Sequence, residues 1–196
     1  MHFRCTRSLR QTLGIADSDV SLPDDTQVHG LWDWHCRVAD AGRSWCLLFT
    51  QTTTLYSVVA FGVVPRTPEH LARRLRSSLQ CVLGADGFAR ADMDFLLGSV
   101  HDTFGATRGA SIVGSMNDFA RMLKWHIVEA GGVTRVDLLH LYSGLNDAPM
   151  GALGMETPLH ALRAALSTDR GRAASRGDAR RVGRKSAPEN GGQSAA

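Results

Sequence analysis

The stretch from Gly30 to Thr50, GLWDWHCRVADAGRSWCLLFT, constrains the fold most strongly, because its first half alternates with a period of two. Successive side chains of a β-strand point to opposite faces, so this pattern predicts a strand with two different faces. One face carries Asp33, His35 and Arg37, and the other carries Trp32, Trp34, Cys36 and Val38. A turn is expected near residues 40–43, and the apolar residues 45–50 then predict a returning strand in the interior of the sheet.

Two further stretches extend the β pattern. Phe3 and Cys5 alternate with polar neighbours, which predicts a short strand at residues 2–6. Thr6 is placed to cap a short helix that Gly14 ends. Residues 54–61, TLYSVVAF, predict another strand after a short polar link. We therefore expect the early part of the chain to form an antiparallel β-meander.

The period of the apolar side chains changes after Pro65. Leu71, Leu75 and Leu79 recur at helical spacing, which predicts a helix from Pro68 to Gly84. Further helices are expected at residues 92–100, 115–130, 134–147 and 158–166, and an extended segment at residues 107–114. Strands early and helices late predict an α+β fold, in which an N-terminal antiparallel β-meander packs against several C-terminal helices.

Composition divides the chain into a single globular domain at residues 1–167 and a basic tail at residues 168–196. The tail holds seven basic and three acidic residues, whereas residues 1–167 hold 15 basic and 16 acidic ones. Almost no large apolar side chain is present in the tail to offset the entropy of ordering, which predicts disorder. A solvated extension is one interpretation of the tail, and a weak, salt-dependent contact with nucleic acid is the alternative.

Cysteine spacing and hydropathy exclude several classes of protein. The four cysteines are widely spaced among apolar residues, which predicts buried, reduced thiols rather than a disulfide framework or a zinc site. No stretch approaches the roughly 18 apolar residues of a membrane span, and the N-terminus lacks the apolar core of a signal peptide. We therefore expect a cytoplasmic protein without a membrane partner. The cysteines are Cys5, Cys36, Cys46 and Cys81.

The segment GSMNDFARMLKWH, residues 114–126, reads as the start of a helix. Ser115, followed three residues later by Asp118, fits an N-cap with an acidic residue in the first turn, and the glycines at 131–132 supply the end. The apolar positions gather on one face, which predicts a core stripe. They are Met116, Ala120, Leu123, Ile127 and Ala130, with Phe119 at the margin.

The polar residues of this helix do not converge on one point. Asn117, Arg121 and Lys124 align on one flank, whereas His126 falls on the opposite flank. Trp125 lies away from the apolar stripe, which indicates a second packed layer, a groove wall or an interface. The candidate binding residues are Trp125, Arg121, Lys124 and Arg37.

Five stretches in this order resemble a family of small bacterial proteins that is described as a domain of unknown function. The similarity covers residues 1–167 and excludes the tail. It implies a compact α+β domain, and it assigns no activity or catalytic residue to any position. The stretches are MHFRCT, WDWH, LLFTQTTTLYSVV, GSMNDFARMLKWHIVEAGG and LNDAPMGALG.

A site is conceivable where the first strand face meets the helix. Asp33 and His35 lie about 7 Å apart on one strand face, and a carboxylate beside a histidine tunes it for general-base work or metal binding. If the helix N-terminus packs there, Asn117 and Asp118 complete a pocket. The alternative is structural: a solvated strand face and a helix cap.

Two functions from different classes remain open. The first is a non-enzymatic binding or interaction module for a protein or small molecule, and the second is a small hydrolase or metal-assisted enzyme that uses Asp33, His35, Asn117 and Asp118. No zinc-protease, phosphate-loop, nucleophile-elbow or dinucleotide motif is present, so we expect no cofactor and no metal site.

Overall fold

Three consecutive strands form the antiparallel meander that the alternating pattern predicts. The computed structural model describes residues 1–20, 30–41, 44–62, 64–98 and 101–169. β2 (Asp33–Ala41) pairs antiparallel with β3 (Ser44–Gln51), which in turn pairs antiparallel with β4 (Ser57–Phe61). The predicted turn near residues 40–43 lies partly outside the described residues.

Two parallel strands complete the sheet on the other side of β2. β1 (His2–Cys5) runs parallel both to β2 and to β5 (Thr103–Ala106), and the strand order is β4-β3-β2-β1-β5. The α+β class is therefore confirmed. The expectation that the whole early part is antiparallel is wrong for β1, and β5 was not predicted. A parallel pair needs a long connection, and 97 residues separate the end of β1 from the start of β5, so local patterning gives no sign of this pairing.

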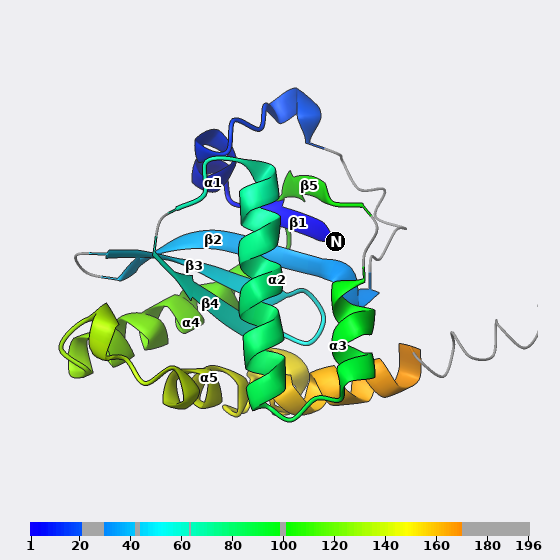
Figure 1. Cartoon of the computed structure of the whole chain (residues 1–196), viewed down its shortest axis with the longest axis vertical. Helices are drawn as coiled ribbons and strands as arrows, with labels where there is room; N and C mark the ends of the chain where they lie inside the picture. The colour runs from blue at the N-terminus through cyan, green and yellow to red at the C-terminus, as the bar shows by residue number, and fades with distance from the viewer. Residues whose placement is uncertain (21–29, 42–43, 63, 99–100, 170–196) are drawn as a thin grey trace, which may run out of the picture.

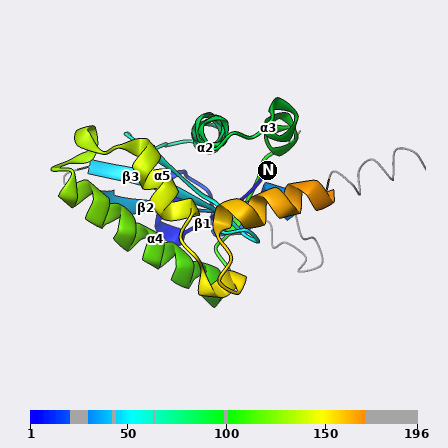
Figure 2. The ribbon, with the colours of Figure 1, turned by 90° about the horizontal axis from the view of Figure 1, so that it is seen from below.

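Helices cover both faces of the sheet. Figure 1 shows α2 crossing one face, and Figure 2 shows α2 and α3 on one side of the sheet with α4 on the other. α5 packs against both α4 and β4. A last helix occupies residues 158–169. The other bounds are α1 (Arg7–Thr12), α2 (Pro68–Ala85), α3 (Arg90–Leu97), α4 (Ala110–Glu129) and α5 (Leu138–Asn146).

The apolar residues that recur at helical spacing in α2 form one side of the hydrophobic core. Leu71, Leu75 and Leu79 are fully buried, together with Trp34 of the sheet. Complete burial of a leucine side chain contributes roughly 1.5–3 kcal/mol, so this stripe holds α2 on the sheet. Thr67 is the N-cap, and its side chain accepts a hydrogen bond from the backbone amide of His70.

Helix α4 begins five residues before the predicted N-cap. Its N-cap is Gly109, and Ser115 is a buried residue of the helix interior whose hydroxyl donates to the backbone oxygen of Ser111 at 3.2 Å. The extended segment expected at residues 107–114 is therefore wrong from Ala110 onward. Phe119, expected at the margin of the apolar stripe, is fully buried. The predicted end is confirmed, because Gly131 follows the helix with a positive φ of 77°.

Three smaller differences concern Thr6, Trp32 and Cys81. Thr6 is the N-cap of α1, but its side chain makes no capping hydrogen bond. Trp32 belongs to a short 3₁₀ turn, Gly30–Trp32, rather than to the strand, and its indole donates to the backbone oxygen of Phe95. Cys81 lies on the exposed side of α2, so the expectation of a buried thiol is wrong there and right for the other three cysteines.

The predicted tail, residues 168–196, lies outside the described residues from position 170 onward. Among the helices that the structure describes, none has the length and apolar character needed to span a membrane.

Candidate functional site

The residues Asp33, His35 and Arg37 lie on the face of β2 that α4 covers. Asp33 and His35 are almost completely buried, with exposed fractions of 3% and 1%. The solvated strand face considered as the structural alternative is therefore wrong. The reason is tertiary, because α4, which lies more than 70 residues later in the chain, packs over this part of the sheet.

Asp33 is held by an arginine of the neighbouring strand. Arg4 Nε and Nη2 donate to the two carboxylate oxygens of Asp33, and Nε–Oδ1 and Nη2–Oδ2 both measure 2.9 Å. The parallel register aligns Arg4 with His35 and places Asp33 two residues back on the same face. A fork-shaped guanidinium matches a carboxylate well, so this buried pair is geometrically specific. The carboxylate of Asp33 therefore binds the guanidinium of Arg4 and makes no hydrogen bond to His35.

A polar turn between β3 and β4 forms another wall. The side-chain oxygen of Gln51 accepts hydrogen bonds from the backbone amides and the hydroxyls of both Thr53 and Thr54. Thr52 donates to the backbone oxygen of Asp33 through its hydroxyl and its amide. Leu55 completes the turn with a positive φ of 58°, an uncommon conformation for a leucine. This turn is thereby fixed in place against β2.

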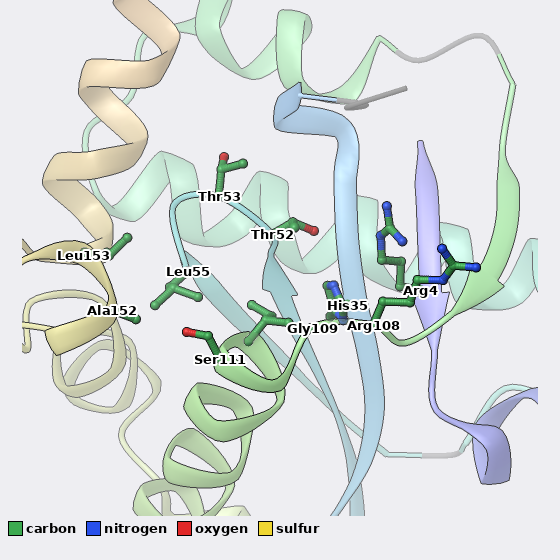
Figure 3. A pocket seen from close by; sticks show the side chains of 11 residues that line it. Arg4, His35, Thr52, Thr53, Leu55, Arg108, Gly109, Ser111, Ala152 and Leu153 are labelled. Atoms are coloured by element: carbon green, nitrogen blue, oxygen red, sulfur yellow. The ribbon is translucent and has the colours of Figure 1, made fainter. Parts of the chain in front are cut away.

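These elements surround a pocket of about 370 Å³ that contains His35. We call it the His35 pocket. In Figure 3, Leu55 and Leu153 lie on one side of His35, and Arg4 lies on the other. The N-terminus of α4 closes it, because Gly109, Ser111 and Ile112 are among the lining residues. The lining residues are Arg4, His35, Thr52, Thr53, Leu55, Arg108, Gly109, Ser111, Ile112, Ala152 and Leu153.

His35 is unusual among the lining residues because a buried polar atom of its ring has no partner. Within the described part of the chain, its Nδ1 makes no hydrogen bond. Burial lowers the pKa of His35 to about 4; Asp33 opposes this shift, whereas Arg4 and His2 add to it. His35 is therefore a neutral imidazole at physiological pH, and perturbed titrating groups of this kind concentrate at functional sites.

Asn117 and Asp118 lie at a different place. Arg37 donates to the side-chain oxygen of Asn117 at 2.6 Å. The middle of α4 therefore contacts the polar face of β2 at Arg37 rather than at His35. The structure does not bring Asn117 or Asp118 into the His35 pocket. The expected four-residue site is wrong in that respect, because α4 starts earlier than predicted and its first turn, rather than Asn117, reaches His35.

Arg37 lines a second depression, which we call the Arg37 groove. Two of its basic side chains are paired with carboxylates: Arg121 with Asp118 on the same helix, and Lys124 with Asp40 at 3.8 Å. The predicted binding residues Arg121 and Lys124 thus form exposed ion pairs. The groove is lined by Arg37, Asp40, Gly114, Asn117, Asp118, Ala120, Arg121 and Lys124.

Trp125 is exposed, so the second packed layer that was one of the three expectations for it is wrong. Its exposed fraction is 58%, and its ring packs edge-on against His126 with 4.9 Å between ring centroids. His126 in turn contacts His140 of α5 at 5.3 Å. The predicted role of Trp125 as a partner contact stays a prediction.

The sequence reasoning missed most of the His35 pocket. Arg4, Arg108 and Ser111 were not among the candidates, and no local motif marks them. A usable signal existed in the quoted stretches, because MHFRCT, WDWH, LLFTQTTTLYSVV and LNDAPMGALG each contribute lining residues. Among the described residues, no group of three or more histidine, cysteine or acidic side chains is placed to hold a metal ion.

The fold and the pocket together define a small α+β domain with a mixed five-stranded sheet and a partly apolar pocket at the N-terminus of one long helix. The chain belongs to the family described as Domain of unknown function (DUF6933), whose family model matches residues 2–161. All residues that line the His35 pocket fall within this match. No curated protein and no solved structure matches the chain.

Proposed function

We propose that this chain is a non-enzymatic binding domain whose small-molecule ligand occupies the His35 pocket. The observation that carries the proposal is the buried Nδ1 of His35, which has no hydrogen-bond partner within the described residues although it belongs to a pocket-lining side chain. A buried polar atom without a partner costs about 1–3 kcal/mol. A ligand that satisfies the imidazole recovers part of this free energy on binding.

The size and composition of the pocket agree with this function. A volume of about 370 Å³ falls in the range of small-ligand sites, and its wall combines apolar residues with a few polar groups. Ligand sites commonly combine apolar contact area with a small number of fixed polar groups that orient the ligand.

The alternative of a small hydrolase receives less support. Asn117 and Asp118 line the Arg37 groove instead of the His35 pocket. Asp33 accepts hydrogen bonds from Arg4, and the Nδ1 of His35 makes no bond to it. A general base normally requires an orienting partner within hydrogen-bond reach, and this pair lacks that contact.

A ligand-observed NMR screen tests the proposal. A mixed library of neutral, cationic and anionic small molecules is applied to the full chain and to Ala152→Trp, whose large ring fills the pocket from its exposed rim. The control is Gln80→Trp, at an exposed position of α2 on the other side of the sheet. We expect compounds that bind the wild type and Gln80→Trp but not Ala152→Trp. Equal binding to all three proteins contradicts the proposal.

Two predictions concern other parts of the chain. The basic residues 168–196 stay a predicted weak contact for nucleic acid, supported by their charge alone. Exposed Trp125 stays a predicted contact for a protein partner. Both are independent of the His35 pocket, and deletion of residues 168–196 leaves ligand binding in the screen unchanged if this separation is correct.

A further inference from the structure

We infer that the ligand of the His35 pocket is a small organic oxyanion, whose carboxylate or phosphate group binds at the N-terminus of α4 beside Arg4 and Arg108. This inference rests on the proposed function and specifies the chemistry of the ligand. Four features of the pocket carry it: the sign of its charged side chains, the uncapped helix end, the unpartnered imidazole and the apolar opposite end.

The charged side chains that line the pocket have one sign. Among the described lining residues, Arg4 and Arg108 are basic and none is acidic. Asp33 partly neutralises Arg4, but the pair uses Nε and Nη2 of the guanidinium and leaves Nη1 outside it. Asp33 is not itself a lining residue. The pocket therefore presents positive charge to a ligand.

The N-terminus of α4 adds backbone hydrogen-bond donors that also favour an anionic ligand. α4 is 20 residues long, and its N-cap residue, Gly109, has no side chain to cap the first turn. The first amides of a helix have no intrahelical acceptor, and the helix dipole places partial positive charge there. Gly109, Ser111 and Ile112 bring this helix end to the pocket wall. Uncapped helix N-termini are favourable binding positions for carboxylate and phosphate groups.

His35 supplies an independent observation that points to a ligand. Its ring lies between the arginines and the apolar end of the pocket in Figure 3, and its buried Nδ1 has no partner among the described residues. The charged and titrating groups that face it are Asp33 on its own strand, Arg4 and His2 on β1, and Arg108 before α4. Only Asp33 among these is acidic, and Arg4 already binds it. An oxyanion provides an acceptor for a protonated Nδ1 and a charge opposite to that of the two lining arginines.

The apolar end of the pocket favours an organic ligand over a bare inorganic ion. Leu55, Ala152 and Leu153 contribute apolar surface there. A ligand with an apolar body beside its anionic group removes this surface from water, at roughly 25 cal/mol per Å². The geometry therefore favours an organic acid or a phosphate ester over phosphate alone.

Matched probes test the charge requirement with the full chain. Benzoate, phenyl phosphate and benzamide are titrated into ¹⁵N-labelled protein at neutral pH, and the amide resonances of Gly109, Ser111 and Ile112 are followed. We expect both anions to shift these resonances and benzamide to bind at least about tenfold more weakly, because it has the same ring and no charge.

Two substitutions that change the net charge equally locate the binding. Arg108→Gln weakens benzoate binding by about tenfold, since it removes one charged donor from the pocket. Arg73→Gln, at an exposed position of α2, changes it by less than about twofold. Thermal unfolding of both variants checks that they fold. A measurement on the wild type is independent of folding: saturation with benzoate raises the pKa of His35, read from its ring proton shifts.

The outcomes separate the two proposals. If benzamide binds the pocket as tightly as benzoate, the inference is overturned and the proposed function stands. Anion shifts that map elsewhere, or equal losses in Arg108→Gln and Arg73→Gln, overturn the inference as well. If no probe and no library compound affects the pocket resonances, the inference and the proposed function both fail.

Discussion

The His35 pocket and the Arg37 groove lie on the same face of β2, and the two residues that name them are only two positions apart. In the groove, the charges of Arg121 and Lys124 are paired with carboxylates at the surface. In the pocket, two arginines and a buried imidazole meet without an acidic lining residue among those described. The two depressions therefore differ in the groups that line them. The groove carries acidic and basic side chains at the surface, whereas the pocket combines basic side chains with a buried imidazole.

Helix α4 causes this difference because it touches β2 with different parts of its length. Its first turn closes the pocket, where uncapped amides are available. Its second to fourth turns cover the groove, where Asn117 accepts a hydrogen bond from Arg37 and the backbone amides are used within the helix. The same helix therefore provides donors to one depression and side-chain partners to the other.

The largest expected effect compares one ion pair from each region. Asp33→Ala lowers the free energy of unfolding by about 3–5 kcal/mol, because it leaves the largely buried charge of Arg4 without its partner. Asp118→Ala removes the exposed partner of Arg121 and costs less than about 1 kcal/mol. Urea denaturation of both variants gives the two values. Equal losses contradict the assignment of a buried and an exposed pair.

The second effect is the pH dependence that His35 imposes. Burial lowers the pKa of His35 from 6.5 to about 4, so between these values the unfolded chain binds a proton that the folded chain does not. The free energy of unfolding therefore falls as the pH drops from 6.5 towards 4, by up to about 3 kcal/mol. His35→Phe removes this part of the slope, which denaturation at a series of pH values measures. A variant with an unchanged slope refutes the assignment to His35.

The third effect concerns the groove alone. Asn117→Ala removes the hydrogen bond that Arg37 donates and lowers the free energy of unfolding by about 0.5–1.5 kcal/mol. The affinity for benzoate stays unchanged, because Asn117 does not line the His35 pocket. Denaturation and the NMR titration test the two halves separately. A loss of benzoate binding in a folded Asn117→Ala protein shows that the two depressions are one site.

The smallest effect tests where α4 begins, which decides whether its N-terminus belongs to the pocket. Ser115→Ala changes the free energy of unfolding by less than about 0.5 kcal/mol, because Ser115 is an interior residue that bonds back to Ser111. Loss of a true N-cap costs about 0.5–2 kcal/mol. Thermal and urea unfolding distinguish the two values, and a loss at the upper end of the N-cap range places the helix start at Ser115.

The parts of the fold that were predictable depend on neighbours in the sequence. The alternation from Asp33 to Val38 and the leucine spacing in α2 each report a single element with one buried face, so they identify β2 and α2 correctly. The start of α4 was missed because Ser115 and Asp118 imitate a cap, while the β-branched Ile112 and Val113 suggest an extended chain. Packing of Ile112 into the core overrides that local preference.

The candidate site was predictable only in part. Asp33 and His35 were identified because they share a strand face, and the structure places Asp33 next to the pocket and His35 in it. Their burial was not predictable, because it depends on α4. Arg4 and Arg108 were not identified. Arg4 lies beside His35 because β1 pairs with β2, and Arg108 lies in the pocket wall because α4 packs over β2.

By itself, the sequence determined the α+β class, the antiparallel meander of β2, β3 and β4, the apolar stripe of α2 and the position of Trp125 away from the apolar stripe of α4. These features follow from periodicity, which local geometry enforces. Only the tertiary structure decided that β1 and β5 pair in parallel, that α4 starts at Ala110, and that His35 is buried beside two arginines. Contacts between distant segments create these features, because burial and charge balance at one residue depend on the chain that packs over it.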